Sequence, residues 1–291
     1  MSDGSPPQGP GPLQWSDVPR LHRPVLVAAF EGWNDAGSAA STAIGHLEEH
    51  WDAEPFAEID PEEFFDFSST RPEVQFSEVG SREIIWPDNR FSAASDVDGK
   101  GLDVITLNGV EPQLRWRTFV EQVVTVVQRY DVQLVLTLGA LLADVPHSRP
   151  VSVFGATDDE HLLDEHDLVP SQYEGPTGIV GVLHAACGTQ GIPSASLWAA
   201  VPTYLPNAPS PKAALALVRK AEALLHVEVP AGDLESASRA YERQVDEAVA
   251  GDDETAAYVT RLEESFDEEA TDLGSGDELI EEVERFLRDQ S

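Results

Sequence analysis

The most informative stretch of the sequence begins Tyr173-Glu174-Gly175-Pro176-Thr177-Gly178 and ends at Leu225. A loop, an apolar segment with helical spacing, a short strand at 194–200 and a second helix from Pro211 follow one another, which predicts an α/β unit. Gly175 and Gly178 allow backbone angles and close approaches that a Cβ atom would block. Pro176 suits the first turn of a helix, whose free N–H groups either hold an anion or are capped by the protein itself.

Apolar runs in the rest of the chain predict further elements of the same kind. Buried strands are expected at 24–30, 103–108, 133–140 and 151–155. Amphipathic helices are expected at 38–51, 114–130, 176–189 and 211–226. Short, partly antiparallel strands are expected at 56–67 and 73–86, and a turn at 87–90. Strands that alternate with helices in this way predict a three-layer α/β/α sandwich with a mixed, mostly parallel sheet.

The two ends of the chain differ in composition from its middle. We expect a disordered leader at 1–12, an α/β/α core domain at 13–230 and an acidic helical C-terminal region at 231–291. The last region holds 20 acidic and 5 basic residues. Its amphipathic helices, expected at 233–250, 255–266 and 277–287, either pack on the core domain or form a bundle that meets a partner helix.

Charge and cysteine content limit the possible partners and the compartment. The formal net charge of −35 makes nucleic acids and anionic membrane surfaces poor partners, because like charges repel. Cys187 is the only cysteine, so no disulfide can form within the chain, as expected in a reducing cytosol. The first ten residues lack the basic start and apolar core of a signal peptide, and no apolar run reaches the roughly 20 residues that span a bilayer. We therefore expect a cytoplasmic protein with no nucleic-acid or membrane partner.

Motifs in three parts of the chain together resemble one known family. The first is Phe30-Glu31-Gly32-Trp33-Asn34-Asp35-Ala36-Gly37, which follows the first core strand. The second is Leu138-Gly139-Ala140 with Pro146 after it, and the third is the stretch 173–178 followed by Gly191-Ile192-Pro193. Over residues 24 to about 226 the chain resembles the proteasome assembly chaperone 2-like family. It is most similar to the actinobacterial branch, whose members carry an added helical C-terminal region.

The resemblance implies a fold related to nucleoside phosphorylases and similar hydrolases, and self-association into a trimer or a larger assembly. Relatives in eukaryotes and archaea act in 20S proteasome assembly, and those that bind the proteasome often end in a hydrophobic–Tyr–any tail. This chain instead ends Arg288-Asp289-Gln290-Ser291. Bacterial members are sometimes labelled ATP-grasp or carboxylate–amine ligases, but the sequence contains no glycine-rich phosphate loop with its lysine.

A candidate pocket is predicted where the loops leave the carboxyl ends of the core strands, because such loops converge on one crevice in open α/β sheets. Its expected residues are Glu31, Gly32, Asn34, Asp35, Asn108, Gly139, Tyr173, Glu174, Gly175 and Gly178. Glu111, which follows Asn108 closely, belongs to the same group of loops. Two carboxylates there could exchange a proton if burial raised the pKa of one. The alternative is that Asn34 and Asp35 cap the helix that begins near Ala36.

Two other polar segments have simpler interpretations. The run from 158 to 167 has the composition of a metal site, but His161 and His166 are five residues apart and would point in different directions on a helix. We expect a solvated acidic loop and no metal. His147, beside Ser148 and Arg149, could act on an anion, although Pro146 and Pro150 indicate a turn.

The sequence as a whole favours a non-catalytic, homo-oligomeric protein-binding or assembly-chaperone-like protein that uses no cofactor. Its expected partners are copies of itself and another protein. The alternative is a small-molecule enzyme, similar to a nucleoside phosphorylase, a hydrolase or a carboxylate–amine ligase, with its pocket at the strand carboxyl ends.

Overall fold

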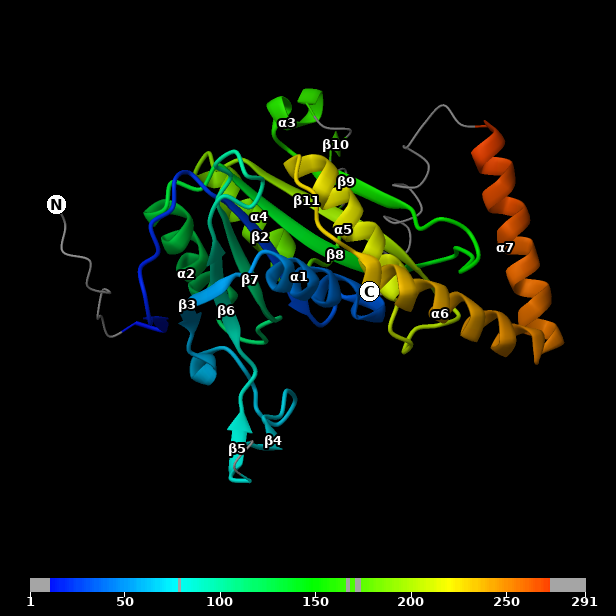
Figure 1. The fold of residues 1–291 in the computed structure, drawn as a ribbon, viewed down its shortest axis with the longest axis horizontal. Helices are drawn as coiled ribbons and strands as arrows, with labels where there is room; N and C mark the ends of the chain where they lie inside the picture. Colours follow the sequence, from blue (N-terminus) through cyan, green and yellow to red (C-terminus); the bar gives the residue numbers. More distant parts are fainter. Residues whose placement is uncertain (1–10, 78–79, 166–167, 171–173, 273–291) are drawn as a thin grey trace.

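The computed structural model describes residues 11–77, 80–165, 168–170 and 174–272, which fold into three layers, α/β/α (Figure 1). The strands of the main sheet lie in the order β1-β3-β6-β7-β2-β8-β11-β9-β10. Their bounds are β1 Leu13–Trp15, β2 Val25–Glu31, β3 Glu54–Ile59, β6 Asn89–Ala94, β7 Val104–Val110, β8 Leu134–Ala143, β9 Val153–Thr157, β10 Val169–Pro170 and β11 Ser194–Pro202. The helices are α1 Ala39–His50, α2 Trp116–Arg129, α3 Glu160–Glu165, α4 Ile179–Thr189, α5 Pro211–Leu225, α6 Gly232–Ala250 and α7 Asp253–Asp272.

Parallel pairing joins the four central strands and recurs at one edge of the sheet, where β10 pairs parallel with β9. Strands β7, β2, β8 and β11 run parallel to one another, whereas β1, β3 and β6 on one side and β9 on the other pair antiparallel to their inner neighbours. The central strands are buried on both faces, which explains why they appear in the sequence as continuous apolar runs. The predicted mixed α/β/α architecture is therefore confirmed.

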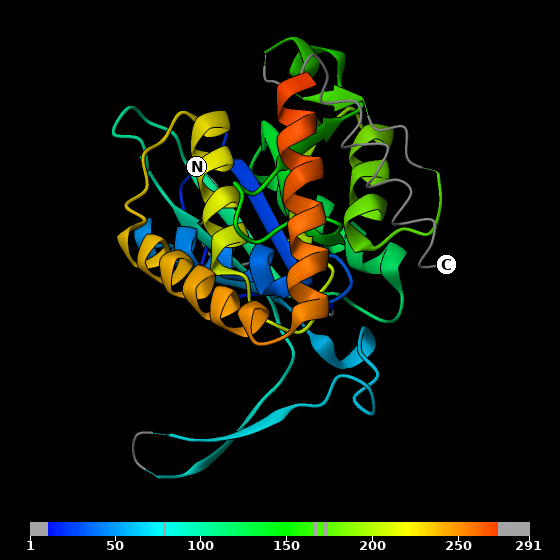
Figure 2. The same cartoon turned by 90° about the vertical axis from the view of Figure 1, so that its right-hand side faces the viewer.

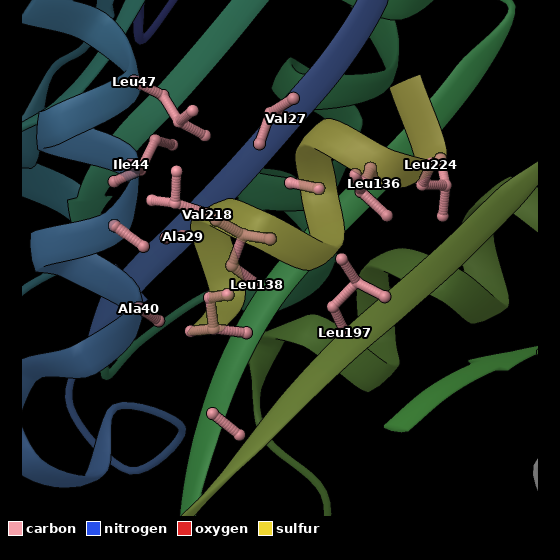
Figure 3. Close-up of a cluster of buried hydrophobic side chains, with 14 of the residues drawn as sticks. Val27, Ala29, Ala40, Ile44, Leu47, Leu136, Leu138, Leu197, Val218 and Leu224 are labelled. Carbon is pink, nitrogen blue, oxygen red and sulfur yellow. The ribbon is translucent and has the colours of Figure 1, made fainter. Parts of the chain in front are cut away.

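Each face of the sheet carries its own apolar core. Helices α1 and α5 cover one face, where Val27, Ala29, Leu136 and Leu138 of the sheet meet side chains such as Val218 of α5 (Figure 3). Helices α2 and α4 cover the other face, whose core is rich in phenylalanine. The buried aromatic residues of that second core are Phe30, Phe56, Phe64, Phe65, Phe91, Phe119 and Tyr130. Successive residues of β2 alternate between the two cores, because side chains on a strand point alternately to either side.

The C-terminal helices lie on the outside of this sandwich. Leu234 of α6 joins the core beneath α5, and Tyr241 and Val245 of α6 are also buried. Helix α7 buries Val259 and half-buries Leu262. Helices are therefore present in the first two of the three predicted C-terminal segments, and α6 packs on α5. The third segment, at 277–287, lies outside the described residues.

Three local predictions need correction. The strand expected at 56–67 ends at Ile59, and a turn of 3-10 helix over Pro61–Glu63 follows it. The expected turn at 87–90 is wrong, because β6 begins at Asn89 and pairs with β3 and β7 on its two sides. Its polar and small residues, Asn89, Ser92, Ala93 and Ala94, lack the β-branched character of a typical strand. Pairing on both edges nevertheless satisfies the strand's backbone, and Asn89 Nδ2 donates to the Val110 carbonyl oxygen at 3.1 Å. The acidic segment expected to be a loop contains the short helix α3.

A separate two-stranded sheet leaves the body between β3 and β6. Strands β4 (Glu73–Phe76) and β5 (Arg82–Ile85) pair antiparallel, and the hairpin projects away from the layers in both views (Figures 1 and 2).

None of the helices within the described part of the chain is both long and apolar enough to cross a bilayer.

We predict that replacing Gly139 of β8 with alanine destabilises the fold. A Cβ atom at this position would lie 2.6 Å from ring carbons of Trp198 on the neighbouring strand β11. Overpacking of this kind lowers the free energy of unfolding by about 1–3 kcal/mol, which urea denaturation would measure.

The matched control is Gly188→Ala, at an exposed position in α4 where an added Cβ atom meets nothing within 4 Å. Because alanine favours helix more than glycine does, the free energy of unfolding of this variant should rise by up to about 1 kcal/mol. Equal effects of the two substitutions would contradict the packing of Trp198 over Gly139.

Candidate functional site

A cavity of about 270 Å³ opens at the carboxyl ends of the central strands. It lies between the loop that follows β2, the end of β8, one residue of β11 and the loop that precedes α5. The lining residues are Gly32, Trp33, Asn34, Asp35, Ala36, Gly37, Ser38, Ala140, Leu141, Leu142, Trp198, Pro206, Asn207, Ala208 and Pro209. The cavity is therefore at the edge of the sheet where the sequence predicted a pocket.

The loop after β2 is tied down on both of its sides. The Asn34 carbonyl oxygen accepts a hydrogen bond of 2.8 Å from the Ala140 N–H of β8, and the Gly37 carbonyl oxygen accepts one of 2.7 Å from the Ser210 N–H. Gly37 has φ 61° and Ser38 has φ 49°, so the chain turns through the left-handed region just before α1. These bonds and this turn fix the shape of one cavity wall.

Asp35 caps helix α1. Its Oδ1 atom accepts hydrogen bonds from the Ala40 N–H at 2.7 Å and the Ser41 N–H at 3.2 Å, and its Oδ2 atom accepts one from the Ser41 hydroxyl at 2.6 Å. The capping interpretation of this loop therefore holds for Asp35. Burial raises the pKa of the Asp35 carboxyl, and the hydrogen bonds from Ser41 and Ala40 oppose that rise.

Glu111 plays the same part at the start of helix α4. Its Oε1 atom accepts a hydrogen bond of 2.8 Å from the Ile179 N–H, so a carboxylate of the protein occupies this helix start. Gly178 sits beside this contact without a side chain, because a Cβ atom there would overlap Asn34 Nδ2 and Glu111 Oε1. Among the described residues, Asn34 Nδ2 is buried and has no hydrogen-bond partner.

The predicted pocket residues separate into three groups. The first group, Gly32, Asn34 and Asp35, lines the cavity. The second group lies next to lining residues: Gly178 faces Asn34, and Gly139 lies under the ring of Trp198. Other predicted residues lie outside the lining. These are Glu31, which ends β2 beside the cavity, Asn108, which lies beneath α1, and the exposed Glu174 and Gly175. Tyr173 falls outside the described residues.

Asn108 belongs to a separate polar contact beneath α1. Its Nδ2 atom donates to Glu48 Oε2 at 2.9 Å, and the Thr106 hydroxyl donates to Glu48 Oε1 at 2.7 Å. Glu48 therefore joins helix α1 to strand β7.

The sequence analysis missed the aromatic part of the cavity. Trp33 is exposed over 42% of its surface at the cavity wall, and Trp198 comes from a strand far along the chain. Trp33 lies inside the Phe30–Gly37 motif, so its position was available from the sequence. Trp198 could be placed only by the register that sets it opposite Gly139.

Acidic residues crowd the end of strand β2. Partial burial raises the pKa of the Glu31 carboxyl, and repulsion from Asp35, Asp88 and Glu73 raises it further. Within the described residues, Glu31 forms no salt bridge with a cationic side chain. The charged form of Glu31 is therefore disfavoured in the folded chain.

A second polar network joins the loop after β8 to helix α6. The Tyr204 hydroxyl oxygen accepts from the His147 N–H at 2.8 Å and lies 2.7 Å from His147 Nδ1, while Nε2 lies 3.0 Å from Asp246 Oδ1. Because the Tyr204 hydroxyl can donate its own proton to Nδ1, Nε2 of a neutral imidazole donates to Asp246. His147 is thus a buried structural link between the loop and α6.

Basic residues of the same region hold both C-terminal helices. Lys212 Nζ donates to the carbonyl oxygens of His147 at 2.6 Å and Arg149 at 2.7 Å, and pairs with Glu242 of α6 at 2.5 Å. The Arg149 guanidinium makes two hydrogen bonds to the Asp267 carboxylate of α7, at 2.8 and 2.7 Å. This pairing lowers the pKa of Asp267. The acidic helices are therefore attached to the strand-end loops through two of the chain's few cations.

The chain is similar in sequence and fold to several solved proteins. A model of the PAC2 family matches residues 29–249. A PAC2 family protein from Streptomyces avermitilis is 47% identical, with a TM-score of 0.76, over 81% of this chain and 99% of that chain. A proteasome-assembly chaperone homologue from Mycobacterium tuberculosis is 46% identical, with a TM-score of 0.73, over the same shares of the two chains. A Mycobacterium tuberculosis protein of unknown function is 29% identical, with a TM-score of 0.83, over 97% of both chains. The chain matches no curated protein.

We predict that Asp35→Ala destabilises the protein, because it leaves the Ala40 and Ser41 N–H groups without their acceptor. The free energy of unfolding should fall by about 1–3 kcal/mol, as measured by urea denaturation. Asp35→Asn keeps one acceptor oxygen and should lose less. An alanine variant as stable as the wild type would contradict the capping role.

We predict that Glu31→Gln stabilises the protein at neutral pH. The folded chain raises the pKa of Glu31 above its ordinary value of 4.5, so the stability that depends on this group falls as the pH rises through the raised pKa. The melting temperature of the variant should exceed that of the wild type at pH 7. The difference should shrink below pH 4.5, where the carboxyl is protonated in both the folded and unfolded states. A difference that is independent of pH would contradict the repulsion.

Proposed function

The chain belongs to the PAC2 family, and we propose that it is a non-catalytic, homo-oligomeric protein-binding factor of the assembly-chaperone kind. In this proposal it acts in the cytoplasm, and its partners are copies of itself and another protein. The resemblance noted in the sequence is thereby confirmed at the level of the family, and the specific role remains our proposal.

The observation that carries the proposal is how carboxylates around the central strands are used. Asp35 holds the start of α1, Glu111 holds the start of α4, and Glu48 holds the side chains of β7. A general acid or base must reach a substrate with its proton or lone pair. These three carboxylates instead accept hydrogen bonds from groups of the protein itself.

The names of similar proteins point in the same direction. The Mycobacterium tuberculosis protein that is 46% identical over 81% of this chain is described as a proteasome-assembly chaperone homologue. A protein partner, and a 20S proteasome subunit in particular, is therefore our candidate for the binding partner of this chain.

A small-molecule enzyme is the second candidate, and the cavity favours it. The cavity has two tryptophans in its wall, and Glu31 with its raised pKa lies next to it. Its volume of about 270 Å³ is slightly below the roughly 300–1,000 Å³ of typical ligand pockets. In this alternative a nucleoside or a carboxylate would bind among the predicted pocket residues. That these residues together form one binding site stays a prediction.

A pull-down from the native cytosol tests the first candidate. The tagged full-length chain should enrich 20S subunits. An unrelated bait of similar acidic charge should not do so, which would exclude capture by charge alone. If the two baits recover the same proteins, the proposed function is wrong.

A thermal-shift screen with nucleosides, phosphate and ATP separates the two candidates. We expect none of these compounds to raise the melting temperature, because a ligand stabilises a protein only by binding its folded state. A rise of several degrees with one class of compound, lost in a cavity variant such as Trp33→Ala, would favour the enzyme instead.

A further inference from the structure

The cavity at the strand ends opens where strands β2 and β8 separate. The two strands pair over residues 25–28 of β2, and they meet again at the bridge between Asp35 and Ala140. Ligands of open α/β sheets bind in the crevice outside the carboxyl ends of the strands. The cavity volume of about 270 Å³ suits a molecule smaller than the ligands of typical pockets.

Negative charge surrounds this cavity. Asp35 lines it, and none of the described lining residues is a lysine, an arginine or a histidine. Glu111 lies against the lining residue Gly32, because a Cβ atom at Gly32 would stand 3.5 Å from Glu111 Oε2, and Glu31 ends the strand beside it. Lys212, the lysine closest in sequence to the lining residues, is paired with helix α6. The cavity therefore attracts a cation and repels phosphate and carboxylate groups.

Hydrogen-bond acceptors in the loop after β2 are already engaged. The Asp35 carboxylate accepts three hydrogen bonds from α1. Four carbonyl oxygens of the loop each accept a backbone N–H, namely those of Gly32, Asn34, Asp35 and Gly37. An ammonium group that carries N–H donors needs free acceptors when it leaves water. A quaternary ammonium group has no N–H donor, so it can enter this cavity without them.

Two tryptophans supply the surface that a quaternary ammonium group needs. Trp33 and Trp198 both line the cavity, Trp33 with 42% of its surface exposed and Trp198 half-buried. The face of an indole ring carries partial negative charge and attracts a cation within about 6 Å of the ring centre. Among aromatic rings tryptophan binds cations best, and quaternary ammonium ligands are commonly recognised in this way.

We propose that the cavity binds a small quaternary ammonium cation. The methyl groups of the cation contact the rings of Trp33 and Trp198. Its positive charge is balanced by the carboxylates of Asp35, Glu31 and Glu111. The site goes beyond the proposed protein-binding function, because each can exist without the other. Its ligand is cationic, and therefore differs from the nucleoside or carboxylate of the alternative enzyme.

Isothermal titration calorimetry on the full-length chain tests the ligand chemistry. The probe is choline chloride, and the matched control is neohexyl alcohol, in which a carbon atom replaces the charged nitrogen. Choline should bind at least about tenfold more tightly than the alcohol, and its affinity should fall as sodium chloride is added. Phosphocholine, whose phosphate the carboxylates repel, should bind more weakly than choline. Equal affinities for choline and the alcohol, or no heat of binding at about 10 mM choline, would overturn the proposal.

Two pairs of variants locate the site. Trp33→Leu removes the indole but keeps an apolar side chain, so the affinity for choline should fall about tenfold, whereas Trp33→Phe keeps a ring and should lose less. Glu31→Gln removes a negative charge beside the cavity and should weaken binding about threefold. Glu49→Gln removes the same charge from an exposed position in the last turn of α1, and should leave the affinity unchanged. If all four variants bind choline equally, choline binds elsewhere and the proposed site is wrong.

A short peptide that contains trimethyl-lysine separates a small molecule from a protein as the source of the cation. The peptide carries the same quaternary ammonium group on a protein side chain. If the peptide binds and choline does not, a small cation is the wrong occupant. The 20S pull-down decides the proposed function separately, and Trp33→Leu should recover 20S subunits as well as the wild type does. Failure of either proposal therefore leaves the other standing.

Discussion

Helices α1 and α4 both begin at the carboxyl edge of the parallel strands, and the backbone N–H groups at their starts must find acceptors there. Asp35 accepts for α1 and Glu111 accepts for α4. A buried donor left without an acceptor costs about 1–3 kcal/mol, so both loops are held in place by these contacts. The cavity wall, the turn before α1 and the missing side chain at Gly178 all follow from this requirement.

The charge of the chain is arranged around the same edge. The carboxylates of Asp35, Asp88 and Glu73 repel the charge of Glu31 at this edge, and other acidic residues gather on α6 and α7. The few cations of the region, chiefly Arg149 and Lys212, connect those helices to the strand-end loops. Individual exposed ion pairs stabilise by under about 1 kcal/mol, so α6 also depends on the burial of Leu234 and Tyr241. Attachment of the acidic helices therefore combines apolar packing near α5 with charge pairing farther out.

Local pattern was enough to predict most of the sandwich, because the strands β2, β7, β8 and β11 consist mainly of apolar residues. It failed at β6, whose residues Asn89 to Ala94 are stable as a strand only because two neighbours complete its hydrogen bonds. The position of the candidate site followed from the rule that loops converge at strand ends. The residues that line the site did not follow from that rule. The position of Trp198 depends on the long-range register of β11 with β8, and Asn108 is hydrogen-bonded to Glu48 of α1.

The contact between Gly139 and Trp198 has a consequence for how the sequence can change. The indole ring fills the space that a side chain at position 139 would need, on the strand directly alongside. Neither position can therefore change alone. A larger residue at 139 requires a smaller one at 198, and a smaller residue at 198 by itself opens a void beside the cavity. In evolutionary terms the two sites form a single unit of variation, and substitutions at them should arise as a pair.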